Sequence, residues 1–292
     1  MGMRLRENLY QLVIGFLLVL LALSMIFPFL YILSISFTHS SVYVSGSLRL
    51  WPEKWSLEAY KVIFLGPGFT SALKSSLFIT LVGTPLSILA NCMMAYMLSK
   101  PTLPGRKLML NLVVFTMLFG PGLIPNYLLI RNLGLINSYW AIILPGLVGA
   151  WTLLVMKSFF QNIPKEIEES AQMDGCSELG VFFRIVLPLS KAMLAAFTLF
   201  NAVGFWNTYF NAVIYLIDSD KWPLQVFLQQ VVMSANIDEF MGVDYMRTLE
   251  RNVPSEVLKM ASVVIVTAPV LIAYPFLQKH FAKGVMIGSI KG

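Results

Sequence analysis

Long apolar runs alternate with short polar segments along the whole chain. Six of these runs carry few charges, and each is about as long as, or longer than, the 20 or so apolar residues that cross a bilayer as a helix. The pattern predicts an all-α polytopic membrane protein with six transmembrane helices, several kinked by proline, at residues 9–37, 70–98, 108–131, 139–160, 185–217 and 257–280. The first and fifth runs exceed the bilayer thickness, so we expect them to tilt or to extend into water.

The composition supports a membrane protein. Hydrophobic residues make up 57% of the chain and charged residues 12%, whereas soluble domains average about 45–50% and 25%. The basic residues stand singly at the ends of apolar runs, which argues against a nucleic-acid-binding patch. Cys92 lies in an apolar run and Cys176 in a polar loop, so no disulfide framework is implied. His39 and His280 are too few and too far apart to form a metal site.

The polar segments define the topology of a single transmembrane domain over residues 1–292. An even number of spans places both termini on one side, and the excess of basic residues in short loops identifies the cytoplasmic side. The loop SKPTLPGRK carries Lys100, Arg106 and Lys107 and no acid. We therefore expect both termini, the tail 281–292 and a polar loop at 162–188 in the cytoplasm, and the loops 38–69 and 218–256 outside. Arg4 and Arg6 precede a first run that we interpret as an uncleaved signal anchor.

The polar loop has the local signals of two short helices separated by a turn. Pro164 suits the first turn of a helix, and the acids Glu166, Glu168 and Glu169 complement the positive helix end. Asp174-Gly175 is a turn signal, and Ser177 can cap a second helix that runs past Pro188 into the fifth span and carries Val181, Phe182, Ile185 and Val186. These signals alone favour an ordinary cytoplasmic helical hairpin.

The segment from Pro164 to Pro188 resembles the EAA loop of the permease subunits of ABC importers. It contains Glu169-Ser170-Ala171, Asp174-Gly175 and Leu187-Pro188, and it departs from the pattern only in small residues, Ser170 and Cys176. The resemblance implies that this loop seats in a cleft of a partner ATPase subunit and couples ATP hydrolysis to the permease. The coupling residues would be Glu169, Ser170, Ala171, Asp174 and Gly175.

Two further segments resemble carbohydrate-type ABC permeases. They are GFWNTYFNAVIYL, from Gly204 to Leu216, and the tail FAKGVMIGSIKG, from Phe281 to Gly292. The tail resembles that of the second, smaller permease of carbohydrate systems, and within that class the chain is most similar to permeases of oligo- and polysaccharide importers, including the alginate importer. The resemblance implies ATP-driven import by alternating access across a bacterial cytoplasmic (inner) membrane. It also implies a second homologous permease, two ATPase subunits that bind ATP and Mg, and an extracytoplasmic solute-binding protein, with no cofactor in this chain.

The fifth span carries uncharged polar side chains that could line a substrate pathway. Successive residues of a helix are about 100° apart. On a continuous helix, roughly a third of the circumference would therefore hold the side chains of Asn201, Asn207, Thr208, Asn211 and Tyr215, together with Gly204. Amides and hydroxyls can exchange hydrogen bonds with sugar hydroxyls, and an aromatic face such as that of Trp206 can stack on a sugar ring. Polar contacts between helices explain the same stripe equally well. For Asn91 and Tyr96 in the second span, packing is the favoured interpretation.

Other classes of function fit the sequence less well. No GxxxxGK[ST] phosphate loop is present, so the chain itself is not expected to hydrolyse ATP. No catalytic or metal-binding residues are predicted, since no nucleophile–base pair or His/Asp/Glu cluster appears. An ion-coupled secondary transporter would need ionisable groups inside the spans, which hold essentially none. An ABC importer of a non-carbohydrate cargo remains the alternative.

Two basic residues, Arg131 and Lys74, lie at the borders of spans and are interpreted as interfacial anchors.

Overall fold

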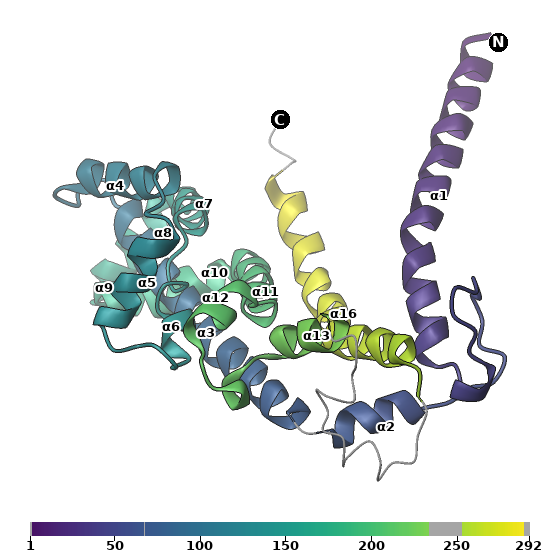
Figure 1. Ribbon diagram of the computed structural model, residues 1–292. Coiled ribbons are helices and arrows are strands. Elements are labelled where there is room, and N and C mark those ends of the chain that lie inside the picture. The colour runs from purple at the N-terminus through teal and green to yellow at the C-terminus, as the bar shows by residue number, and fades with distance from the viewer. Residues whose placement is uncertain (1, 67, 234–252, 289–292) are drawn as a thin grey trace. The chain divides into compact units, whose positions relative to one another are not determined.

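The computed structural model describes residues 2–66, 68–233 and 253–288, with side chains described for 10–66, 68–233 and 253–275 (Figure 1). The described backbone is helical, and its only extended pairing is an isolated bridge between Thr38 and Trp55. The chain divides into two compact units. Unit 1 comprises Met1–Phe69 and Leu228–Ala268, and unit 2 comprises Thr70–Phe227 and Pro269–Gly292.

Unit 1 is built on the first helix, α1 (Gly2–Ser36), and the segment that follows it. That segment contains a 3₁₀ helix, η1 (Ser40–Val42), and α2 (Glu58–Leu65). The ring of Phe37 packs at 5.0 Å from that of Tyr60, whose hydroxyl donates to Ser36 Oγ at 2.8 Å. The Tyr43 hydroxyl donates to Glu256 at the start of α16 (Ser255–Gly288). These contacts order the predicted outer loop 38–69 against the helix ends.

Unit 2 holds the middle of the chain. Its first helix is α3 (Phe69–Ser99), followed by α4 (Arg106–Leu118), α5 (Leu123–Asn132), α6 (Trp140–Ile143), α7 (Ala150–Gln161), α8 (Lys165–Met173), α9 (Glu178–Val181), a π-helix η2 (Phe182–Val186), α10 (Leu187–Leu189), α11 (Lys191–Trp206), α12 (Phe210–Tyr215) and a 3₁₀ helix η3 (Ser219–Lys221). Helix α13 (Leu224–Met233) begins in this unit and gives the predicted loop 218–256 a helical part. The main core joins α3, α7, η2 and α11 through Ala95, Leu98, Met156, Phe182 and Phe197.

Three of the predicted spans are single helices. The segments Tyr10–Ser36, Phe69–Ser99 and Ser255–Pro275 are each long and apolar enough to cross a bilayer. They match the predicted spans 9–37, 70–98 and 257–280, and Pro28, Pro85 and Pro269 lie within them without ending the helix. Helix α16 continues to Gly288, so the first part of the predicted tail 281–292 is helical.

The other three predicted spans are not continuous helices. Residues 108–131 divide into α4 and α5, bent by 117° at a break that contains Pro121 and Gly122, whose φ is +83°. Residues 139–160 divide into α6 and α7 around Pro145, which donates no backbone hydrogen bond. Among the described residues the structure therefore offers three spans, or up to five if each bent pair counts as one.

The predicted span 185–217 is wrong at both ends. The axis bends by 83° at Ser190, between α10 and α11, and α11 ends at Trp206. After Trp206 the backbone closes with a tighter turn, in which the Thr208 amide donates to the Phe205 carbonyl, and Tyr209 leaves the helical region with φ −122° and ψ −64°. Asn and Thr side chains compete with helical hydrogen bonding, which explains a helix end within an otherwise apolar run.

The ring of Phe205 occupies a space that only glycines leave open. A Cβ added at Gly83 of α3 would lie 3.0 Å from this ring, and one at Gly146, in the α6–α7 break, would lie 3.2 Å from it. Three segments distant in sequence thus meet around one buried aromatic ring. The absence of side chains at the two glycines is a packing requirement of unit 2.

We expect Gly83→Ala to destabilise the protein by about 1–3 kcal/mol, because the added methyl group overpacks a ring that Gly146 prevents from retreating. Thermal unfolding of the purified protein in detergent measures the effect, and a second change, Phe205→Leu, should restore part of the loss. Gly15→Ala in α1 is the matched control, since a Cβ there meets nothing within 4 Å. Equal unfolding midpoints for the two alanine variants would contradict the packing requirement.

Candidate functional site

The first half of the polar loop 162–188 is a short helix that ends in a glycine turn. Helix α8 begins directly after Pro164. It ends where the Gly175 amide donates to the Gln172 carbonyl at 3.0 Å and the Cys176 amide donates to the Ala171 carbonyl at 3.0 Å. Gly175 has φ +81°, a conformation that costs other residues roughly 1–2 kcal/mol. The predicted turn at Asp174-Gly175 is confirmed.

The second half of the loop returns into the core. Ser177 Oγ accepts a hydrogen bond from the Gly180 amide at 3.2 Å, which confirms the predicted helix cap. The buried side chains of Val181, Phe182 and Val186 then pack in the main core of unit 2. The second half of the loop is therefore anchored in the core of unit 2. The predicted continuation into the fifth span is wrong, because the axis bends sharply at Ser190.

The tip of the loop presents polar and apolar side chains together. Glu169, Ser170, Asp174 and Gly175 are exposed, whereas Ala171 is half-buried and packs against the main core. Two apolar side chains stand among them: Met173 is 88% exposed and Leu179 63% exposed. Methionine is among the residue types enriched at protein–protein interfaces, so the exposed Met173 side chain suits a docking surface for another protein.

The opposite side of α8 faces the end of α3. Glu168 is 9% exposed, its Oε2 accepts a hydrogen bond from the Tyr96 hydroxyl at 3.0 Å, and it forms an ion pair with Lys100. The Lys100 ammonium lies 4.3 Å from the centroid of the Tyr96 ring. Sequence reasoning treated Glu168 only as a helix-end charge and missed this contact. The four-residue spacing of Tyr96 and Lys100 at the end of an apolar helix was the available signal.

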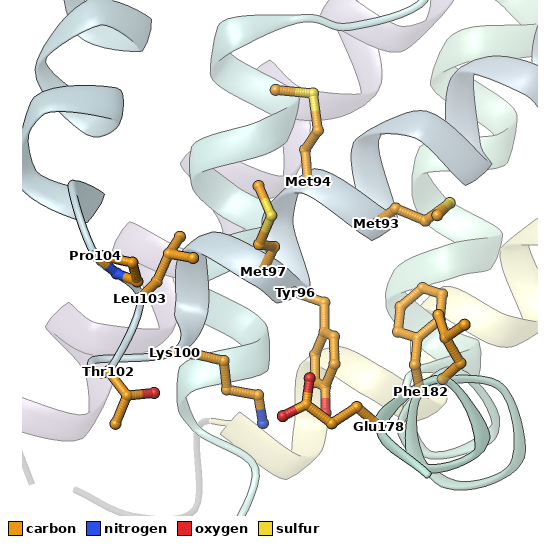
Figure 2. A pocket seen from close by; sticks show the side chains of 11 residues that line it. Met93, Met94, Tyr96, Met97, Lys100, Thr102, Leu103, Pro104, Glu178 and Phe182 are labelled. Atoms are coloured by element: carbon orange, nitrogen blue, oxygen red, sulfur yellow. The ribbon is translucent and has the colours of Figure 1, made fainter.

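A hollow of about 590 Å³ opens beside this contact (Figure 2). Its walls are mainly apolar, with methionines of α3 on one side and Leu179 and Phe182 of the loop on the other. Tyr96, Lys100 and Glu178 are directed toward one another at its edge. Burial lowers the pKa of Lys100, and the carboxylate of Glu178 opposes that shift.

Asn201 belongs to a polar network between helices. Its Oδ1 lies 2.9 Å from the Ser87 hydroxyl, and its Nδ2 donates to the Phe197 carbonyl at 2.8 Å. Ser87 Oγ also lies 2.9 Å from the Leu147 carbonyl, to which Asn91 Nδ2 donates at 2.7 Å. The α6–α7 break exposes this carbonyl, and the network satisfies it. For Asn201 and Asn91 the contacts favour helix packing over a pathway role.

The remaining residues of the predicted stripe separate into two groups. Tyr215 is buried and stacks on Tyr127, with ring centroids 6.4 Å apart, and Trp206 is also buried. Asn207 and Asn211 are exposed, at the end of α11 and on α12.

The side chains of Asn207 and Thr208, which follow Trp206, each make one polar contact. The Asn207 Oδ1 accepts from Gln225 Nε2 at 2.8 Å, and Thr208, half-buried, lies with its hydroxyl 3.4 Å from the Gly204 carbonyl. A stripe on one continuous helix is wrong because α11 ends at Trp206, but Asn207 and Asn211 remain accessible on successive segments.

Comparison with known proteins places these features in a family. The family described as "Binding-protein-dependent transport system inner membrane component" matches residues 63–287. Protein LplC of Bacillus subtilis (strain 168) is 48% identical over 268 residues, which cover 91% of this chain and 90% of the relative. The polygalacturonan/rhamnogalacturonan transport system permease protein YtcP of the same organism is 45% identical over 288 residues, covering 98% and 100%.

A solved structure shares the fold. It is the crystal structure of a bacterial ABC transporter involved in the import of the acidic polysaccharide alginate. It matches with a TM-score of 0.88 and 32% identity, over 94% of this chain and 97% of the other.

The chain belongs to the family of binding-protein-dependent transport system inner membrane components. It is a multi-pass, non-catalytic permease subunit of an ABC transporter, and the resemblance of the chain to such permeases is confirmed at the level of the family. Transport of this kind implies an ATPase, a partner permease and a binding protein.

We expect Asn201→Ala to lower the free energy of unfolding by about 0.5–1.5 kcal/mol, because it removes the hydrogen bond between the Asn201 amide oxygen and the Ser87 hydroxyl. The unfolding midpoint in detergent should fall while the KM for cargo in reconstituted transport stays unchanged. Asn211→Ala, at an exposed site on α12, is the control and should leave the midpoint unchanged. A stable Asn201 variant with a raised KM would instead assign this amide to the pathway.

Proposed function

We propose that this chain is the permease half of an ATP-driven importer for oligo- or polysaccharides. It pairs with a second, homologous permease, two ATPase subunits bind ATP and Mg, and an extracytoplasmic solute-binding protein delivers the cargo. The observation that carries the proposal is the loop 162–188, which has an exposed docking tip on a base anchored in the core of unit 2. No cofactor is expected in this chain.

The tip of the loop supplies the coupling surface in this proposal. Gly175 makes the turn, the small Ser170 permits close approach of the ATPase, the half-buried Ala171 permits close packing of α8 on the core, and the exposed acids Glu169 and Asp174 can meet basic groups of the ATPase. The apolar side chains of Met173 and Leu179 add burial on docking. Closure of the ATPase dimer would then move a loop whose base is fixed to the permease.

The proposed orientation places both termini in the cytoplasm. The ion pair of Lys100 with Glu168 supports one part of it, because it puts the basic loop that follows α3 beside the coupling loop. Arg106 and Lys107 follow in that loop. Short loops rich in Lys and Arg favour the cytoplasmic side, and the ATPase is on that side.

The proposed cargo is a carbohydrate. Support comes from the relatives, whose names include polygalacturonan/rhamnogalacturonan transport and alginate import. The accessible amides of Asn207 and Asn211 stand beside Tyr209 and Phe210, which are 39% and 60% exposed. Amides that exchange hydrogen bonds and rings that stack are the groups that sugars need. An acidic glycan is a second candidate, and the residues from Asn207 to Tyr215 include no base, so the partner permease would have to supply the cation.

Gly175→Trp should abolish the stimulation of ATP hydrolysis by cargo-loaded binding protein, while the protein still inserts into the membrane. Tryptophan both strains a backbone with φ +81° and adds bulk at the docking tip. The measurement is the ATPase rate of the purified assembly in lipid. Gly105→Trp is the matched control, since it has φ +73°, nothing lies within 4 Å of its Cβ position, and it lies in the neighbouring loop. Normal stimulation of an assembled Gly175 variant would refute the coupling role.

A panel of cargoes tests the proposed substrate class. The assembly in lipid, with binding protein, is given neutral oligosaccharides, acidic oligosaccharides, peptides or ions, and ATP hydrolysis is followed. We expect stimulation by one class of glycan. Stimulation by peptides or ions alone would retain the coupling role and refute the carbohydrate assignment.

A further inference from the structure

Helix α8 carries three acids, of which one is buried. Glu166 and Glu169 are exposed, whereas Glu168 is buried against the end of α3. A buried carboxylate is costly unless charged and polar partners compensate it. Its contacts therefore identify what this side of the helix is built to hold.

The partners of Glu168 come from the last turn of α3 and the residue after it. One carboxylate oxygen accepts from the Tyr96 hydroxyl at 3.0 Å and also receives the Lys100 ammonium. The ring of Tyr96 is itself held, with its centroid 5.1 Å from that of Phe182 and 6.0 Å from that of Phe160. Two directional polar contacts thus join α8 to a point that packing has already fixed.

Helix α3 extends this connection into the middle of unit 2. It is one continuous helix of 31 residues. Further along it, Ser87 and Asn91 hold the Leu147 carbonyl in the α6–α7 break, and Gly83 receives the ring of Phe205 from α11. A displacement applied at the end of α3 is therefore applied to the break and to α11, because close-packed contacts transmit strain.

We propose that Glu168 is a positioning residue that fastens the coupling loop to α3 through Lys100 and Tyr96. When the docked loop moves, this fastening makes α3, the α6–α7 break and α11 move with it. The proposal rests on the proposed coupling function of the loop. It adds that the loop transmits through a defined ion pair and hydrogen bond, in addition to its connection through the chain to η2 and α11.

Charge exchange tests the fastening. We compare Glu168→Lys, Lys100→Glu and the double exchange in the four-subunit assembly in lipid, and record the ratio of the ATPase rate stimulated by loaded binding protein to the basal rate. Each single change should lower this ratio by about tenfold, and the double exchange should restore most of it. The amount of ATPase that copurifies should be unchanged, because the altered groups are not among the exposed residues of the docking tip.

Milder variants keep the test decisive if a charge reversal prevents assembly. Tyr96→Phe retains the ring packing and removes only the hydroxyl that donates to Glu168, so we expect a smaller loss of stimulation. Glu168→Gln should act in the same direction, and Glu166→Gln, an exposed neutralisation on the same helix, should not.

The outcomes separate this inference from the coupling function itself. Normal stimulation in Glu168→Gln and Tyr96→Phe, together with its loss in Gly175→Trp, would overturn the fastening and leave the coupling loop intact. Normal stimulation in all three variants would overturn the coupling function. A loss in the single exchanges that the double exchange does not restore would also count against the ion pair, since complementary charge would then not be what matters.

Discussion

The fold of unit 2 depends on the need to satisfy backbone carbonyls wherever a helix breaks in an apolar environment. Lipid offers no hydrogen-bond donor, so each unpaired carbonyl there costs several kcal/mol. The α6–α7 break frees the Leu147 carbonyl, to which the Asn91 amide donates from α3, and the Ser87 hydroxyl of the same helix lies 2.9 Å from it. Asn201 joins the same network from α11. These three residues determine how closely α3, the break and α11 approach one another.

This requirement explains why so few polar side chains suffice to organise a largely apolar chain. Apolar packing alone distinguishes poorly between a helix contact with protein and one with lipid, whereas a hydrogen bond has one partner and one direction. The polar residues of unit 2 mark the places where segments must meet. The same logic recurs at the end of α3, where Glu168, Lys100 and Tyr96 connect the helix to the coupling loop.

Sequence periodicity and composition predicted the helical membrane fold, and local signals predicted the turn at Gly175 and the cap at Ser177. What failed was the continuity of the helices at residues 108–131, 139–160 and 185–217. Apolar composition is the same on both sides of a break, so hydrophobicity cannot locate it. Pro85 lies inside a continuous helix, whereas α6 ends just before Pro145. Tertiary contacts decide which of these outcomes a proline has. The burial of Glu168 likewise depends on a contact 68 residues away in the chain.

The exposure of α1 has a consequence for how the protein is made. From residue 10 to residue 30 every side chain of this helix is exposed, and its apolar window is 0% buried. This stretch contributes nothing to the core of its own chain. It can enter the bilayer as soon as it is synthesised, before any later helix exists to receive it. Membrane insertion can therefore begin with a segment that needs only lipid. The broken helices need hydrogen-bonding side chains from other helices, which become available only later in synthesis.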